Sequence, residues 1–165
     1  MEEQFDVVDE NDCVLGQLPR SEVHRRKLRH RAVHVFLLRS DGRMLIHLRS
    51  GSKVEFPSVW TSSASGHVSA GESYDETAPR ELLEELGVRA ELNAARKFAA
   101  CADTCHEFTW LYTAESDDEV APDPGEIADT RWLTPDEISA ELNESPEKFS
   151  PAFRLLFSTW RQQTP

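Results

Sequence analysis

The segment from Gly71 to Val88, GESYDETAPRELLEELGV, constrains the fold most, because it has a helical pattern and yet carries far more carboxylates than cations. Ser73 followed by Glu76 is a capping-box pattern, which marks the start of a helix. Gly87 is the residue type that most often ends one. The spacing therefore predicts a helix from Tyr74 to about Leu86.

On this predicted helix, Glu81, Glu84 and Glu85 lie on or beside one face. Like charges at such spacing oppose helix formation by roughly 0.2 to 0.5 kcal/mol per pair. Arg80 can pair with Glu84 and relieve part of the repulsion, and the leucines between the acids can pack inward. An ordinary acidic amphipathic helix is one interpretation. A site for divalent cations, which would turn the repulsion into ligation, is the other.

Pro79 falls inside the predicted helix, where proline removes a backbone donor and usually costs ~3 kcal/mol. We therefore predict a kink there, or a late and irregular first turn. The clustered carboxylates follow Pro79 in the sequence, so their geometry is expected to survive.

The composition excludes several classes of protein. A chain of 165 residues fits one domain, 1–165, since domains usually hold about 100 to 150 residues. The net charge of −12 argues against a nucleic acid polymer as partner. No stretch approaches the ~18 apolar residues of a membrane span, and the acidic N-terminus does not resemble a secretory signal. We expect a cytoplasmic protein with no membrane partner, in which Cys13, Cys101 and Cys105 are free thiols.

Predicted strands and helices interleave along the chain, which indicates an α/β or α+β class with a mixed sheet. The expected strand regions are a hairpin arm in 5–17, a central hairpin of 32–38 and 44–48, a short piece around 60–61, and strands in 97–102, 108–114 and 130–133. Two more helices are expected to begin near 134 and 150. Residues 50–65 and 115–126 are expected to be mostly loop.

Residues 24–31, HRRKLRHR, form a cationic cluster inside an otherwise acidic chain. One interpretation is a solvated lead-in to a strand, whose charges pair with the excess acids. The other is a site for an anionic group of a substrate, which Arg31 and Arg49 would contact.

A longer motif is more specific than any of these patterns. Its fixed positions are Gly66, Glu72, Arg80-Glu81-Leu82, Glu84-Glu85 and Gly87-Val88. This is a complete match to the Nudix box of the Nudix hydrolase superfamily, here residues 66–88. The resemblance implies the Nudix fold, an α/β/α sandwich with a mixed β-sheet and a loop-helix-loop catalytic motif.

The resemblance also implies a chemistry. Nudix hydrolases use Mg²⁺ or Mn²⁺ to cleave the diphosphate linkage of a nucleoside diphosphate derivative or another X-linked diphosphate, and such hard cations prefer oxygen ligands. The metal ligands expected by carry-over are Gly66, through its carbonyl, and Glu81, Glu84 and Glu85. The expected catalytic residues are Glu81, Glu84, Glu85 and Glu126. The expected structural residues are Glu72, Arg80 and Gly87, with Glu72 paired to Arg80. The expected substrate contacts are Arg31, Arg49, His67 and Trp60.

The segment WTSSASGH, from Trp60 to His67, also resembles the isopentenyl-diphosphate isomerase branch of the superfamily, in which Trp-Thr leads to Cys-Gly-His. The catalytic cysteine of that branch corresponds to Ser65, whose hydroxyl is far less acidic than a thiol. Histidines and glutamates build the isomerase metal site, and the residues near corresponding places are His24, His30, His67 and Glu107. Cys105 stands where a further glutamate is expected. These departures and the intact Nudix box favour a hydrolase.

The greatest overall likeness, over roughly residues 5 to 160, is to bacterial Nudix hydrolases of the YfcD-like group. It includes the N-terminal hairpin arm and lead-in, residues 1–27, and the segment RWLTPDEI at 131–138. It supplies no substrate beyond a small-molecule diphosphate. Dimers are common in the superfamily, so a homodimer is one expectation. Three hypotheses stay open: a metal-dependent diphosphate hydrolase, an isopentenyl-diphosphate delta-isomerase-like enzyme, and a non-catalytic ligand-binding Nudix module.

Overall fold

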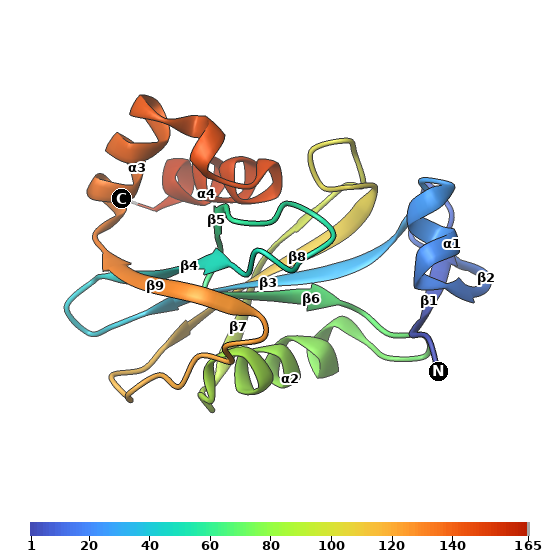
Figure 1. Ribbon diagram of the computed structural model, residues 1–165, viewed down its shortest axis with the longest axis horizontal. Helices are drawn as coiled ribbons and strands as arrows, with labels where there is room; N and C mark the ends of the chain where they lie inside the picture. The colour runs from blue at the N-terminus through green and yellow to red at the C-terminus, as the bar shows by residue number, and fades with distance from the viewer. Residues whose placement is uncertain (165) are drawn as a thin grey trace.

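The computed structural model describes residues 1–164, in which strands and helices alternate (Figure 1). The strands are β1 (Gln4–Val8), β2 (Val14–Pro19), β3 (His30–Leu38), β4 (Met44–Arg49), β5 (Trp60–Thr61), β6 (Ala64–His67), β7 (Leu92–Phe98), β8 (Glu107–Glu115) and β9 (Ile127–Leu133). The helices are α1 (Arg20–Arg25), α2 (Tyr74–Leu86), α3 (Pro135–Glu144), the 3₁₀ turn η1 (Pro146–Lys148) and α4 (Pro151–Gln163). None of the helices in this part of the chain is long and apolar enough to cross a membrane.

The main sheet is mixed, and it forks beside β3. Its strands follow the order β5-β4-β3-β8-β7, with β6 also paired to β3 and β9 to β4. Strands β3 and β8 are parallel, whereas the other pairs are antiparallel. On its other side, β3 pairs with β4 only between Leu38 and Met44, and with β6 from Ala32 to Val35. Strands β4 and β6 therefore diverge, and residues of β3, β4 and β6 line one cavity.

Helices cover both faces of this sheet, α2 on one side and α3 with α4 on the other (Figure 1). The alternation of side chains along β3 explains both contacts. Val33 and Val35 belong to one core cluster with Leu82 of α2. Phe36 belongs to a second cluster, in which its ring centroid lies 5.8 Å from that of Phe153 in α4. The predicted α/β/α sandwich with a mixed sheet is confirmed.

Helix α2 occupies the predicted residues because local contacts specify both of its ends. The Ser73 hydroxyl accepts a hydrogen bond from the Glu76 amide, and the Glu76 carboxylate accepts one from the Ser73 amide. Gly87 ends the helix in the left-handed conformation, with a φ of 68°. Pro79 lies within a continuous helix that begins at Tyr74, so the predicted late first turn is wrong: the capping box fixes that turn ahead of the proline.

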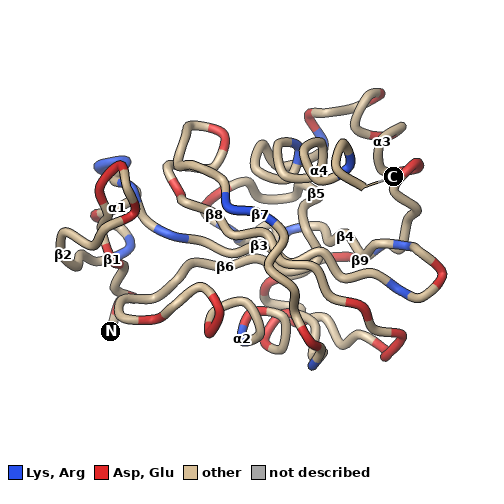
Figure 2. The backbone as a smooth tube through the Cα atoms, turned by 180° about the vertical axis from the view of Figure 1, so that it is seen from behind, with Lys and Arg blue, Asp and Glu red and all other residues tan. Residues whose placement is uncertain are grey.

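Residues 1–27 contain the predicted hairpin arm, in which β1 and β2 pair as a separate small sheet. Helix α1 is a departure from the sequence interpretation of 24–31 as a strand lead-in. It buries only Val23, so no apolar periodicity marks it. Figure 2 shows the cationic segment of α1 at the edge of the molecule. Arg25 pairs there with Glu22 in solvent, which agrees with the solvated interpretation for this part of the cluster.

The rest of the chain follows the predicted order, with two differences. Strand β7 covers Leu92–Phe98 rather than 97–102, and most of its side chains are exposed. Strand β6 begins at Ala64, inside the expected loop of residues 50–65, and is defined by its pairing with β3. Both strands depend on a neighbouring strand rather than on an apolar pattern of their own.

Candidate metal and diphosphate site

Three of the four glutamates of α2, Glu81, Glu84 and Glu85, lie toward the edge of the sheet at β6 in different environments. Glu85 is buried, and its carboxylate accepts a hydrogen bond from the Ser65 amide at 3.1 Å. Glu81 lies so close to Gly66 that a Cβ added to that glycine would come within 2.1 Å of the Glu81 carboxyl carbon. Glu84 is the accessible member, with 57% of its side chain exposed. The close backbone approach expected at Gly66 is present.

Arg80 clamps the loop before α2 onto the helix. Its Nε and Nη2 atoms donate parallel hydrogen bonds of 2.8 Å to the two carboxylate oxygens of Glu72. Its Nη1 atom reaches Glu81 at 2.9 Å and Glu84 at 3.2 Å. Because a bidentate guanidinium–carboxylate pair fixes geometry as well as adding energy, Arg80 orients both the loop and the carboxylates.

The raised pKa values of Glu81 and Glu85 fit a binding site for a divalent cation. Burial raises the pKa of Glu85 to about 8, and the neighbouring Glu81 adds to the shift. Burial also raises the pKa of Glu81 to about 7, an effect that Arg80 offsets only in part. A buried carboxylate beside a partly buried one favours a bound cation. Together with the Gly66 carbonyl, their oxygens are the donors that Mg²⁺ or Mn²⁺ would take.

The acidic loop that follows β8 brings further carboxylates to the end of α2. The amides of Ala121 and Asp123 donate to the carbonyls of Leu86 and Glu85 at 2.7 and 2.8 Å, so the loop satisfies the helix C-terminus. Asp123 and Glu126 line the same cavity as the α2 carboxylates. This placement of Glu126 agrees with the expectation that it lies near the proposed metal ligands.

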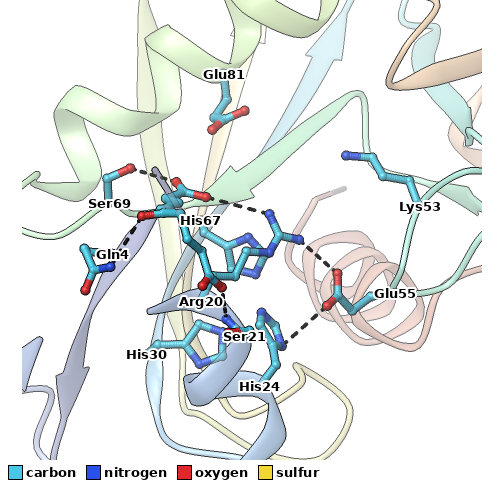
Figure 3. A network of polar contacts seen from close by, with 12 residues as sticks. Gln4, Arg20, Ser21, His24, His30, Lys53, Glu55, His67, Ser69 and Glu81 are labelled. Atoms are coloured by element: carbon cyan, nitrogen blue, oxygen red, sulfur yellow. Dashed lines mark hydrogen bonds and ion pairs between the residues drawn. The ribbon is translucent and has the colours of Figure 1, made fainter. Parts of the chain in front are cut away.

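Cations line the same cavity, which has a volume of about 320 Å³. They are Arg20, Arg49 and Lys53, together with Arg80 of α2. Figure 3 shows Arg20 extending from α1 to its partner Glu55, 3.0 Å away, with Lys53 and Glu81 directed toward the same space. Lys53 is paired with Glu126, and Arg49 donates to the Glu55 carbonyl at 2.8 Å. Carboxylates that suit metal ions and cations that suit phosphate oxygens thus share one cavity.

A second cluster of potential ligands lies where the arm meets the sheet. Ligand nitrogens of His24, His30 and His67 lie within 4.8 Å of one another. Glu107 Oε1 is 3.0 Å from His67 Nε2 and 3.4 Å from His30 Nε2. His30 Nδ1, 2.9 Å from the Leu28 carbonyl, must donate to it, so a neutral ring points an unprotonated Nε2 at a carboxylate. A proton or a metal ion between these two acceptors would resolve the conflict.

Two of the predicted substrate contacts lie away from the cavity. The Arg31 guanidinium donates to Asp12 at 2.6 Å, and Trp60 packs against the core cluster beneath α4. Neither residue lines the cavity, because Arg31 is on the opposite face of β3 from Ala32 and His34, which do line it, and because Trp60 packs against the core cluster. Arg49 and His67 do line it, as expected.

Sequence reasoning missed several residues that line this cavity, among them Arg20, Lys53 and His34. The first two have no local signal, since one lies in the arm and the other is a lone cation in a serine-rich loop. His34 has a weak one, because it is a polar residue inside the apolar strand pattern AVHVFLL.

Comparison with known proteins agrees with this geometry. Residues 28–153 match the family model described as NUDIX domain. An isopentenyl-diphosphate Delta-isomerase of Nocardia farcinica is 37% identical over 154 residues, which cover 88% of this chain and 87% of that one. An uncharacterized Nudix hydrolase of Streptomyces coelicolor is 36% identical over 166 residues, which cover 97% and 91%. The crystal structure of DR0079 from Deinococcus radiodurans has a TM-score of 0.78 at 34% identity, covering 86% and 90%. The chain belongs to the Nudix superfamily, whose enzymes generally use divalent metal ions.

The contact between Gly66 and Glu81 gives a first prediction. A methyl group in Gly66→Ala would displace the Glu81 carboxylate, so Mn²⁺ affinity should fall by about 10-fold or more, measured by calorimetric titration. Gly16→Ala is the matched control, because a Cβ at Gly16 has no atom within 4 Å. Equal Mn²⁺ affinity in the two variants would contradict this assignment.

A second prediction concerns pH and the metal-free protein. The pKa of Glu85, about 8 in the fold, exceeds the 4.5 of an unperturbed glutamate, so between these values the native state binds more protons than the unfolded chain. Stability should therefore fall as pH rises, by about 2 kcal/mol from pH 6.5 to 9 in urea titrations with EDTA. Burial lowers the pKa of His34 and His47 to about 4, so neither titrates in this range. Glu85→Gln should remove most of this pH dependence and leave the smaller part that Glu81, with a pKa of about 7, contributes; a flat profile in the unmodified protein would refute the prediction.

Proposed function

We propose that this protein is a Mg²⁺- or Mn²⁺-dependent hydrolase that cleaves the diphosphate linkage of a small molecule, a nucleoside diphosphate derivative or another X-linked diphosphate. The observation that carries the proposal is the presence of Glu81, Glu84 and Glu85 with Arg49 and Lys53 in one cavity. The complete Nudix box and the family membership support the same reaction.

The roles of the residues follow from their places. When bound, divalent metal ions would neutralise charge on the diphosphate and lower the pKa of the attacking water. Glu81, Glu84 and Glu85 would hold them. Arg49 and Lys53 bind phosphate oxygens and stabilise the charge that develops on the leaving phosphate as the bridging P–O bond breaks.

The reaction also needs a base to take the proton from the attacking water. Glu81 and Glu126 are the two candidates, since both line the cavity and both are carboxylates beside the expected metal ligands. Glu126 is paired with Lys53. A phosphate group that attracts Lys53 would release the Glu126 carboxylate to accept the proton, which couples substrate binding to the availability of a base.

The proposal predicts phosphate or monophosphate release in Mg²⁺ or Mn²⁺ from at least one member of a panel of nucleoside diphosphate derivatives, sugar diphosphates and isopentenyl diphosphate. Glu85→Gln should lower kcat by at least about 100-fold. Glu91→Gln, a change at an exposed glutamate just beyond the Nudix box, is the control and should retain full activity. Turnover that needs no metal ion and persists in Glu85→Gln would refute the assignment.

The histidine cluster favours a second candidate, an isopentenyl-diphosphate isomerase-like enzyme. The relative from Nocardia farcinica carries that name, and His24, His30 and His67 fit a divalent ion. Ser65, which stands in place of the catalytic cysteine, opposes this interpretation. Cys105, which stands in place of a glutamate, opposes it as well: burial and the nearby Glu107 raise the pKa of its thiol to about 11. In the same panel, conversion of isopentenyl diphosphate to its double-bond isomer without cleavage would replace the hydrolase proposal. Tight binding with no turnover would instead favour a non-catalytic module.

A further inference from the structure

The cavity extends past the carboxylates of α2 to the face of the sheet that α4 covers. His34 is two residues before Phe36 on β3, so both side chains are on this face, and Phe36 packs in the cluster of α4. We call the cavity residues on this side the inner pocket; they are His34, Thr61, Thr104, Ser150 and Ala152. His34, Thr61 and Ser150 are buried, with exposed fractions of 6%, 2% and 5%. The inner pocket is thus an enclosed polar extension of the proposed diphosphate site.

His34 offers one ring nitrogen to this pocket. Its Nδ1 atom is 2.6 Å from the hydroxyl oxygen of Ser62, whereas its Nε2 atom has no hydrogen-bond partner among residues 1–164. Burial lowers the pKa of His34 to about 4, so the ring is neutral near pH 7. Since Nδ1 can either accept from or donate to Ser62, Nε2 can either donate or accept. A ligand hydroxyl, which also does both, matches this nitrogen.

A second free donor comes from two hydroxyls in contact. Thr61 Oγ1 and Ser150 Oγ are 2.9 Å apart, and Ser150 Oγ also accepts the Phe153 amide at the start of α4. The pair has two O–H groups and uses one of them in the mutual bond. The other is left over whichever residue donates, and both residues line the cavity. A hydroxyl donor and the His34 nitrogen therefore belong to side chains that line the same cavity.

The inner pocket suits neither a hydrocarbon nor a stacked nucleobase. An apolar group would cover these buried polar atoms and leave them without partners. Base recognition commonly uses an aromatic platform, but Phe56, itself 39% exposed, is the sole Phe, Tyr or Trp among the described residues that line the cavity. Trp60 and Trp110 pack in the core clusters instead. The volume of about 320 Å³ is near the lower end of ligand pockets, which favours a compact ligand.

We propose that the inner pocket selects a compact hydroxylated group, a monosaccharide or small polyol, carried on the diphosphate, with His34 and Thr61 as specificity-determining residues. The inference rests on the proposed function for the position of the diphosphate. It narrows the substrate to a sugar or polyol diphosphate and separates it from the isoprenoid diphosphates named for the isomerase relatives.

Binding tests the pocket without requiring turnover. The probes are the non-hydrolysable methylene analogues of ribose 5-diphosphate and of pentyl diphosphate, which share a five-carbon chain and differ in hydroxylation. Calorimetric titration in Mg²⁺ should give at least about 10-fold tighter binding of the ribose analogue. His34→Asn keeps a group that can bond Ser62 but removes Nε2, and it should abolish most of this preference. Thr61→Val, a change of similar shape, should reduce it as well.

His47→Asn is the matched control. His47 is equally buried and its Nδ1 atom bonds the Ser63 carbonyl at 2.9 Å, but it does not line the cavity, so the preference should be unchanged. Thermal unfolding of each variant verifies that it folds. Equal affinities for the two analogues, no binding of either, or a preference that persists in both His34→Asn and Thr61→Val would overturn the proposal.

Turnover of the parent diphosphates separates this inference from the proposed function. Selective binding of the ribose analogue, without cleavage of either parent compound in Mg²⁺ or Mn²⁺, would refute the hydrolase and leave the pocket assignment standing. Cleavage of both parents at equal kcat/KM, with equal binding of the analogues, would support the hydrolase and refute the pocket assignment.

Discussion

The contact between α2 and β6 is the constraint on which the rest of this structure depends. The Glu85 carboxylate accepts a hydrogen bond from the Ser65 amide, and Glu81 packs against Gly66, which has no room for a side chain. Two acids are thereby held in the protein interior, with pKa values raised by burial. The capping box, the ion pairs of Arg80 and the loop bonded to the end of α2 all hold the helix in this position. There the two neighbouring carboxylates, which repel each other, could bind a cation.

Arg80 balances part of this negative charge from within α2, and the remaining cations of the cavity come from distant parts of the chain. Arg20 comes from the arm, Arg49 from β4 and Lys53 from the loop after β4. All three line the cavity. In this state the cations have protein partners, Glu55 for Arg20 and Glu126 for Lys53. An anionic ligand would compete for them, so substrate binding and the freeing of carboxylates are linked by simple charge exchange.

Strand β6 also explains how one scaffold can present two candidate metal sites. Its side chains alternate, so Gly66 faces the carboxylates of α2 while Ser65 and His67 face the other side of the sheet. His67 meets Glu107 there, at 3.0 Å, within the histidine cluster. The residues that differ from the isomerase branch, Ser65 and Cys105, lie on this second side, whereas the Nudix box on the first side is intact.

The sequence alone determined what depends on neighbouring residues: the limits of α2 and the carboxylate cluster, since capping and helical spacing act over a few positions. The pairing of Glu72 with Arg80 was expected from the resemblance to the Nudix box, and the structure contains it. Only the tertiary structure decided which distant side chains complete the site. It excluded Arg31 and Trp60 from the cavity and brought in Lys53, Arg20 and His34. For Arg31 and His34 the reason is that the neighbours of each face of β3 depend on its pairing with β6 and β8 rather than on any local pattern. For Arg20 and Lys53 the reason is that a helix and a loop far apart in the sequence meet at the cavity only in the folded chain.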